Sequence, residues 1–412
     1  MKNAATPILA ATLLASGACR IHNVPRITDV ERMLELLREL GASCSWIADH
    51  TVTVDTRALT ITALTKVVEF HDFKKSPIAR AIEAMRSSVL LIGPLLARFG
   101  SFSFPEPGGC IIGNRPLDAH LEGFRALGAT VVRDTGVYAF SRDSLTGRRI
   151  VLSEFSVTAT ENIIMAATAA SGVTEIHCAA AEPHVVDLVH FLRTLGAHIS
   201  GEGTHIVRIE GGHPLGLGEH TLIPDQIEVG TFAVAAAATR GSVRITNCER
   251  SQLDSVLSRL SAANVKWQWE GESVLHIRRS PELQAFRLQT LPYPGFPTDL
   301  QAPFGVLATQ CQGTSLIHDP MFDGRLSYVA ELVKMGANAV VCDPHRVLIS
   351  GPTPLFGQEI RSPDLRAGAT LVVAGLVARG ESIIHNAEVL DRGYEKLVER
   401  LTLLGADIRR EP

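Results

Sequence analysis

One pattern recurs six times along the chain, and it restricts the possible folds more than any other feature. An Ala- or Leu-rich apolar helix is followed by a glycine and then by a short β-branched strand. The glycines of the six copies are Gly17, Gly100, Gly172, Gly241, Gly313 and Gly380. The first interval is 83 residues and the others are 67 to 72 residues. Recurrence at a nearly fixed spacing indicates an architecture of repeated supersecondary units.

A second pattern follows each copy of the first. It is an amphipathic segment with leucines three and four residues apart, as in a helix. It ends in Gly-Ala at residues 41–42, 128–129, 196–197, 336–337 and 405–406, and runs into Ala262-Ala263 in the fourth copy. A glycine just after the last apolar position predicts a left-handed helix C-cap. Leu-Gly-Ala is a common helix ending, but chance does not explain its recurrence in phase.

Each unit therefore reads as strand, helix, strand, helix and further strands, which predicts an α/β protein. A single TIM barrel is excluded, because it alternates one strand with one helix. We expect two domains of three units, at residues 1–222 and 223–412, with a ligand cleft between them. The longer first interval predicts an insertion, for which Val67–Lys75, including Phe70–Lys75, is the candidate.

Composition excludes several classes of protein. The net charge of −4 over 412 residues and an aromatic content of 5% disfavour general nucleic-acid binding. The seven cysteines are scattered without a Cys-x-x-Cys pair, so we expect no disulfide framework, no metal site and a reducing compartment. The Ala/Leu run up to Ala15 resembles a signal peptide, but it is itself one copy of the repeat. We expect a cytoplasmic protein that is not bound to a membrane.

The segment Pro105–Pro116 is the strongest candidate for a functional loop. Three prolines and three glycines in twelve residues exclude a regular helix or a central strand. The loop carries one thiol, Cys110, and one guanidinium, Arg115. An ordinary loop with an inert cysteine and a mobile lid with a reactive one are equally compatible with this segment alone.

Residues at the predicted helix starts are a second group of candidates. Asp225, Asp299 and Asp364 follow prolines and are expected N-caps. Lys2 and Arg86 are different, because a cation at a helix N-terminus opposes the macrodipole. Their position suggests a phosphate or carboxylate ligand held by the cation and the free N–H groups.

Further basic side chains stand near glycines. Arg325 and Arg392 lie in turns that contain glycine, at comparable points of different repeats. Two interpretations stay open: a functional role, and ordinary pairing at the surface. His120 follows the loop directly, and a structural role is the simpler interpretation of this histidine.

Several motifs together resemble a known family. They are Lys2-Asn3-Ala4-Ala5, Met85-Arg86, Pro107-Gly108-Gly109-Cys110, Gly113-Asn114-Arg115-Pro116, Phe296-Pro297-Thr298-Asp299, Asp364-Leu365-Arg366-Ala367 and Asp391-Arg392-Gly393-Tyr394. In order and over nearly the whole chain, they resemble the UDP-N-acetylglucosamine 1-carboxyvinyltransferases, a family of enolpyruvyl transferases. The resemblance implies an inside-out α/β barrel of two domains, each made of three βαβαββ units.

The resemblance also implies a reaction. The enolpyruvyl group of phosphoenolpyruvate moves to the 3-hydroxyl of UDP-N-acetylglucosamine, by addition and elimination, with release of phosphate for peptidoglycan synthesis. It implies no cofactor, and catalytic roles for Cys110, Asp299 and Lys2, with Cys110 as the target of fosfomycin. The implied phosphoenolpyruvate ligands are Lys2, Asn3, Arg86, Arg115, Arg366 and Arg392. The implied UDP-sugar ligands are Asn3, Arg86, Arg115, His120, Ser156, Val157, Thr158, Asp299, Met321 and Arg325.

The sequence departs from the family pattern at three points. The family's usual N-terminal strands are missing before Met1, Thr158 replaces a usual glycine, and Gln226 replaces a usual arginine. Two alternatives stay open: a catalytically degenerate paralogue that binds the UDP-sugar, and a 5-enolpyruvylshikimate-3-phosphate synthase. In each case we expect small-molecule substrates and a monomer or weak homo-oligomer.

Overall fold

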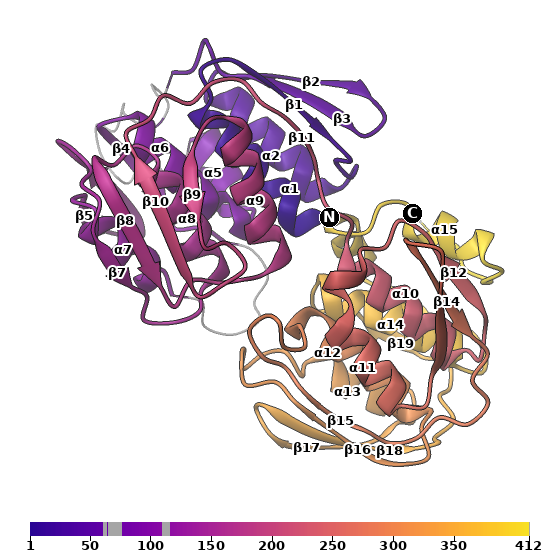
Figure 1. The fold of residues 1–412 in the computed structure, drawn as a ribbon. Coiled ribbons are helices and arrows are strands. Elements are labelled where there is room, and N and C mark those ends of the chain that lie inside the picture. Colours follow the sequence, from indigo (N-terminus) through magenta and orange to yellow (C-terminus); the bar gives the residue numbers. More distant parts are fainter. Residues whose placement is uncertain (61–63, 65–75, 109–115, 412) are drawn as a thin grey trace. The chain divides into compact units, whose positions relative to one another are not determined.

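The computed structural model describes residues 1–60, 64, 76–108 and 116–411. The insertion predicted at Val67–Lys75 and the loop residues Cys110 and Arg115 lie outside these ranges. The described chain divides into two compact units, which we treat separately (Figure 1). Unit 1 comprises described residues up to Ile223, and unit 2 begins at Pro224.

Unit 1 consists of helices around which three sheets are arranged. Its helical elements are α1 (Lys2–Ala11), η1 (Thr12–Leu14), α2 (Thr28–Glu39), α5 (Pro77–Glu83), η2 (Arg86–Leu91), α6 (Ile92–Arg98), α7 (Asp118–Ala126), α8 (Val157–Ala167) and α9 (Pro183–Thr194). Its strands are β1 (Ala18–His22), β2 (Ser43–Ala48), β3 (Thr51–Asp55), β4 (Ser101–Pro105), β5 (Thr130–Asp134), β6 (Val137–Ser141), β7 (Arg149–Val151), β8 (Gly172–His177), β9 (His198–Ser200), β10 (Ile206–Gly211) and β11 (Glu219–Thr221). The sheet orders are β11-β1-β3-β2, β4-β6-β5 and β7-β8-β10-β9.

Unit 2 repeats this organisation. Its helical elements are α10 (Gln226–Ala238), η3 (Arg250–Gln252), α11 (Asp254–Ala262), η4 (Thr298–Leu300), α12 (Gln301–Thr309), α13 (Tyr328–Lys334), α14 (Leu365–Val377), η5 (Ala387–Arg392) and α15 (Leu397–Leu403). Its strands are β12 (Val243–Ile245), β13 (Lys266–Glu270), β14 (Val274–Arg278), β15 (Arg287–Gln289), β16 (Gly313–His318), β17 (Asn338–Asp343), β18 (Arg346–Gly351), β19 (Glu359–Arg361) and β20 (Ile383–His385). The sheet orders are β12-β14-β13, β15-β16-β18-β17 and β19-β20.

The six copies of the first pattern are confirmed as helix–strand pairs. The Ala- or Leu-rich helices are α1, α6, α8, α10, α12 and α14, and each leads into a strand. These helices are apolar on nearly all sides because they form the interior of their unit. In α8, every residue from Ala159 to Ala167 is buried, and in α12 every residue is buried. Helices inside and sheets outside agree with the inside-out arrangement expected from the family.

The second pattern is also confirmed, including its C-caps. Gly196 ends α9 with φ of +105°, and Ala197 N–H donates to the Leu192 carbonyl at 3.0 Å. The fourth copy lacks this glycine and uses Asn264, with φ of +59°, and Val265 N–H donates to the Leu260 carbonyl at 2.9 Å in the equivalent bond. Asparagine tolerates the left-handed conformation better than other side chains that carry a Cβ, so the repeat keeps its geometry without glycine.

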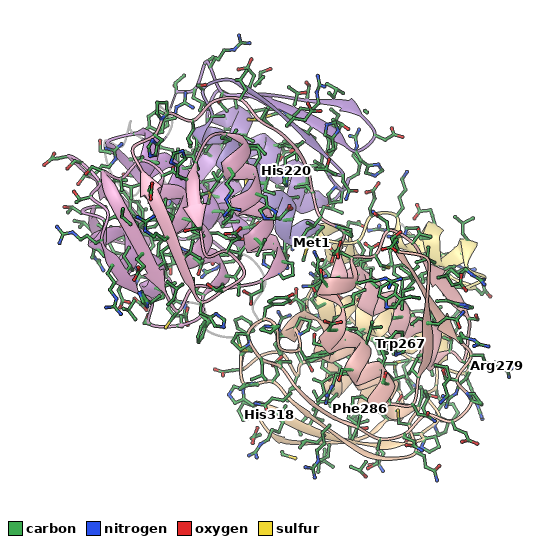
Figure 2. All side chains as sticks on the ribbon, in the orientation of Figure 1. Met1, His220, Trp267, Arg279, Phe286 and His318 are labelled. Atoms are coloured by element: carbon green, nitrogen blue, oxygen red, sulfur yellow. The ribbon has the colours of Figure 1, made fainter. Side chains whose placement is uncertain are left out.

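Aromatic side chains connect a sheet of unit 2 to its central helix. Phe286, labelled in Figure 2, and Phe296 pack edge-on against Phe304 of α12, with ring centroids 5.9 and 5.0 Å apart. Edge-to-face contacts of this kind add to the stabilisation gained by burial. They hold the segment between β15 and α12, which carries Asp299. Within the described residues, no helix has the length and apolar character needed to cross a membrane.

Candidate active site

Asp299 is the centre of an ionic network in unit 2. Its Oδ1 accepts a hydrogen bond from Arg325 Nη2 at 2.6 Å. Its Oδ2 accepts from Arg366 Nε at 3.0 Å and lies 2.9 Å from Arg366 Nη2. The side chains of Arg325 and Arg366 are only 9% and 7% exposed, so both guanidiniums are largely shielded from water, while the Asp299 side chain is 19% exposed. Charge-assisted bonds to guanidinium are short and strong in such surroundings.

The three aspartates at helix starts have different roles. Asp225 caps α10 by accepting from Ile227 N–H and Glu228 N–H, and Asp364 caps α14 through Arg366 N–H and Ala367 N–H. The predicted capping is confirmed for these two. Asp299 lies inside η4, and no side-chain cap bond is made at the start of η4 or α12. The prediction of an ordinary N-cap is therefore wrong for Asp299, because its carboxylate is engaged by the two arginines.

Arg366 belongs to the first turn of α14 and lies close to α10. Its Nη1 is 3.5 Å from the Tyr394 hydroxyl, which also bonds to Thr231 of α10 at 3.0 Å. Burial, the largest single effect, disfavours the charged guanidinium, but the Asp299 carboxylate together with Tyr394 and Asp225 outweighs it, and the pKa of Arg366 is raised. Since α10, α12 and α14 pack against one another, the network joins their N-terminal ends. Helix N-termini favour anions.

Arg325 is positioned through its backbone. Its carbonyl accepts a hydrogen bond from Gln301 Nε2 at 2.8 Å, and Gln301 Oε1 accepts from the Tyr328 hydroxyl at 3.2 Å. Gly305 makes room for this tyrosine, since a Cβ there would stand 2.5 Å from the Tyr328 hydroxyl. Arg325 Nε is buried and has no hydrogen-bond partner among the described residues. Such a donor is available to a ligand.

Asp319 fixes the turn that carries Asp299. This carboxylate is fully buried and accepts from Thr290 at 2.8 Å, from Thr298 at 2.6 Å and from Met321 N–H at 3.0 Å. Thr298 immediately precedes Asp299, and Met321 belongs to the segment leading to Arg325. One buried anion thus orders two segments of the site.

In unit 1, Lys2 begins the central helix α1, as predicted. Its Nζ lies 2.8 Å from Asp29 Oδ2, and the Asp29 side chain is 1% exposed. Asp29 lies in the first turn of α2, where an acidic side chain is favourable. This buried carboxylate supports the cation at the N-terminus of α1 and fixes its direction.

His120 connects α7 to α8 through a neutral hydrogen-bond network. Asn162 Oδ1 accepts from Gly93 N–H at 2.7 Å, so its Nδ2 is the donor to Val89 O and to His120 Nδ1. His120 Nδ1 is then an acceptor and Nε2 carries the hydrogen, which is donated to Thr158 Oγ1 at 3.1 Å. Thr158 can therefore donate its own hydroxyl hydrogen to a ligand.

The other candidate residues are distributed over both units. Arg86 is the first residue of η2, and its Nη1 lies 3.4 Å from the Pro107 carbonyl, next to the loop. Burial lowers the pKa of Arg86, and the Glu106 charge partly opposes this effect. An anionic ligand would compensate the burial of this guanidinium. Asn3, Ser156, Val157, Met321 and Arg392 are partly exposed.

Sequence reasoning missed the side chains that hold the site together. Asp29, Asn162, Asp319, Gln301 and Tyr394 had no predicted role. For Asp319 a signal existed: the corresponding positions of other repeats are Asn23, Cys178, Asn247 and Asn386, all with positive φ. Asp319 does not adopt this left-handed conformation. The sequence thus showed that Asp319 differs from the residues at the same position of the other repeats, because it carries a carboxyl group.

Comparisons with known proteins agree with this geometry. A family model described as EPSP synthase (3-phosphoshikimate 1-carboxyvinyltransferase) matches residues 1–401. UDP-N-acetylglucosamine 1-carboxyvinyltransferase 1 of Caldanaerobacter subterraneus subsp. tengcongensis is 43% identical over 410 residues, covering 100% of this chain and 95% of that protein. UDP-N-acetylglucosamine 1-carboxyvinyltransferase 2 of Mesorhizobium japonicum is also 43% identical over 410 residues, with 99% and 94% covered.

Solved structures show the same fold. The enolpyruvyl transferase NikO from Streptomyces tendae superposes with a TM-score of 0.87 at 26% identity, covering 99% of this chain and 94% of that one. EPSP synthase from Acinetobacter baumannii has a TM-score of 0.72 at 19% identity, with 98% and 93% covered, and supports the fold alone. With full-length relatives above 40% identity, the chain belongs to the enolpyruvyl transferase family and, within it, to the UDP-N-acetylglucosamine 1-carboxyvinyltransferases.

Proposed function

We propose that this protein transfers the enolpyruvyl group of phosphoenolpyruvate to the 3-hydroxyl of UDP-N-acetylglucosamine and releases phosphate, as the first committed step of peptidoglycan synthesis. The observation that carries the proposal is the Asp299 carboxylate between two buried guanidiniums, at 2.6 and 2.9 Å. Carboxylate and guanidinium are the groups that this chemistry requires. The first removes a hydroxyl proton, and the second binds phosphate or carboxylate bidentately.

The reaction follows in two balanced steps. In the addition, Asp299 accepts the proton of the sugar 3-hydroxyl as its oxygen bonds to C2 of phosphoenolpyruvate, and a proton adds to the methylene carbon. In the elimination, a proton leaves the resulting methyl group and the bond between C2 and the phosphate oxygen breaks. We assign the acid at the methylene carbon to Cys110. The cations Lys2, Arg86, Arg115, Arg366 and Arg392 are assigned to the anionic groups of phosphoenolpyruvate.

The pairing of Asp299 adds a condition to this mechanism. A carboxylate that accepts bonds from two guanidiniums is a weak base, because both cations stabilise its charged form. An anionic substrate that competes for Arg366 or Arg325 would withdraw one cation and strengthen the base. Binding of the substrate anion and activation of Asp299 are then the same event.

We assign UDP-sugar recognition to residues that lie in unit 1 and in unit 2. In unit 1 these are Asn3, His120, Ser156, Val157 and Thr158, and the free hydrogen of the Thr158 hydroxyl supports this assignment. In unit 2, Met321 and Arg325 follow the Asp319-ordered segment. Arg325 Nε is a buried donor without a hydrogen-bond partner among the described residues, which supports a ligand contact.

Phosphate release with phosphoenolpyruvate and UDP-N-acetylglucosamine tests the function. We expect release with this pair and none when shikimate 3-phosphate replaces the UDP-sugar. Release only with shikimate 3-phosphate would identify a 5-enolpyruvylshikimate-3-phosphate synthase. If folded protein binds the UDP-sugar but releases phosphate with neither acceptor, it is a degenerate, non-catalytic paralogue.

A further inference from the structure

Three side chains with metal-binding donors meet on the outer face of the β9–β10 pair, in unit 1. His198 on β9 and Glu210 on β10 are direct cross-strand partners. The His198 Nδ1 and Glu210 Oε2 atoms are 3.9 Å apart. His213, just after β10, places its ring 4.1 Å from the His198 ring, centroid to centroid. One donor atom from each of the three lies within 4.8 Å of the other two.

The backbone explains why His213 returns to this face. Gly211 ends β10 against α8, where a Cβ would stand 2.2 Å from the Ala167 and Ala170 carbonyls. Gly212 has φ of +82°, and its N–H donates to the Thr168 carbonyl at 2.8 Å. A positive φ favours glycine, and the bond to Thr168 fixes the turn. The direction of the chain at His213 is therefore set by the fold.

We propose that His198, Glu210 and His213 form a binding site for a borderline divalent transition metal ion such as Zn²⁺. Two imidazoles and one carboxylate match the ligand preferences of zinc, at metal–ligand distances of about 2.0–2.2 Å. Donors around a tetrahedral ion are separated by about 3.4 Å, so rotations of exposed side chains are enough to close the site. The remaining coordination position is open to water.

This site differs from the metal sites considered in the sequence analysis. The proposed metal site contains no Cys-x-x-Cys pair, and its donors come from two strands and a turn. Among the described residues, this is the one group of three or more such side chains close enough to share an ion. It is separate from the residues assigned to the transferase reaction, so its test does not depend on that function.

Arg208 competes with a metal ion for the same carboxylate. Its guanidinium is ion-paired with Glu210 on the same strand. The side chains of Arg208 and Glu210 are 45% and 43% exposed, so the pair contributes little and can be displaced. The carboxylate is thus already held at the face where the imidazoles lie.

Bound metal would join the edge strand β9 to the turn after β10. These segments otherwise meet through the short β9–β10 ladder and the bonds of the turn. An ion that binds the folded state alone stabilises it in proportion to the logarithm of its concentration. We therefore expect zinc to raise the melting temperature of the full-length protein.

Calorimetric titration of the chelator-treated protein with zinc chloride tests the site. We expect one ion per chain, with His198→Gln and His213→Gln each weakening binding at least about tenfold. His190→Gln is the matched control, since His190 also lies 3.9 Å from a carboxylate, that of Glu202, and belongs to no such group of three. Arg208→Gln should bind more tightly than the wild type, because it removes the competing cation.

A cobalt spectrum separates this site from the cysteines. Co²⁺ bound by imidazole and carboxylate shows visible d–d bands without the charge-transfer band of a thiolate. Both His variants should lose these bands, and a urea transition like that of the wild type shows that they remain folded. Absence of wild-type binding, equal binding by the His variants, or a thiolate band that persists in them would overturn the proposal.

Discussion

The hydrogen-bond network of unit 1 and the ionic network of unit 2 use opposite means to hold functional groups. Around Asn162, uncharged donors and acceptors are matched one to one, and the residue is fully buried. Around Asp299, one carboxylate faces two cations, and its side chain remains 19% exposed. The first arrangement fixes orientation without charge, which suits recognition of a polar ligand. The second arrangement holds a carboxylate in ion pairs with guanidiniums, for which a reacting anion can compete.

The largest expected effect concerns the ionic network. Asp299→Asn removes the carboxylate that we propose as the base, and we expect turnover to fall by about 10²–10⁴-fold. The dissociation constant for UDP-N-acetylglucosamine, measured by calorimetry, should remain nearly unchanged. Asp343→Asn is the matched control, because Asp343 is also paired with an arginine, Arg346, but at the surface of the same unit. A wild-type rate for Asp299→Asn would remove Asp299 from the mechanism.

The second prediction measures how much stability this network contributes. Arg366→Gln removes the Arg366–Asp299 ion pair, and breaking a buried pair costs about 3–5 kcal/mol. Urea denaturation should show this loss in the free energy of unfolding. Arg409→Gln provides the comparison, since the Arg409 side chain is 75% exposed and we expect a change below about 0.5 kcal/mol. A loss below about 1 kcal/mol for Arg366→Gln would show that the ion pairs of the network are solvated.

The third prediction concerns the buried carboxyl of Glu161 in α8. Glu161, next to Asn162, is fully buried, and burial, assisted by the charge of Glu182, raises its pKa well above 4.5. Its Oε1 lacks a hydrogen-bond partner within the described residues. A carboxyl whose pKa is higher in the folded state destabilises the protein as pH rises above the unfolded pKa. The slope is about 1.4 kcal/mol per pH unit, until the folded pKa is reached.

Glu161→Gln should remove this dependence. The variant should gain stability over the wild type progressively as pH rises above the unfolded pKa, as measured by urea denaturation at several pH values. Glu122→Gln, on the exposed face of α7, should change the free energy of unfolding by less than about 0.5 kcal/mol. A stability difference between Glu161→Gln and wild type that does not vary with pH would show that folding does not raise the pKa of Glu161.

The smallest expected effect concerns the neutral network. Thr158→Val removes the acceptor of His120 and the hydroxyl hydrogen assigned to the UDP-sugar. One neutral hydrogen bond contributes about 0.5–1.5 kcal/mol, so KM for the UDP-sugar should rise about 2–10-fold with kcat unchanged. Thr130→Val on β5 is the exposed control. A fall in kcat at constant KM would place Thr158 in the chemistry instead of in recognition.

Much of the fold follows from sequence because the repeats are local. Each helix–glycine–strand unit is specified within a few turns of chain, and its recurrence confirms the assignment. In the second pattern, even the fourth copy, which lacks the Gly-Ala ending, keeps a left-handed helix C-cap, through Asn264. Arg325 was a candidate from its place in the repeats, the site roles of Asp299 and Arg366 came from the resemblance, and the structure brings these three together.

The supporting residues could not be predicted in the same way. The pairs Lys2–Asp29 and Asn162–Gly93 join segments 27 and 69 residues apart, and no periodicity relates their members. Buried polar groups are satisfied by whichever partner the tertiary fold supplies. Asp299 was expected to cap a helix, because its local sequence is that of a helix start. Tertiary ion pairs overrode this local preference.

The turn at Asp319 illustrates what duplication makes possible. In four sister repeats the same position has a positive φ, and in two of them, Asn23 and Asn386, the side-chain amide also donates to a backbone carbonyl of another segment. In the fifth copy the residue at this position is instead a buried aspartate that accepts bonds from Thr290, Thr298 and Met321. Specialisation of this chain therefore lies in the places where its internal symmetry is broken.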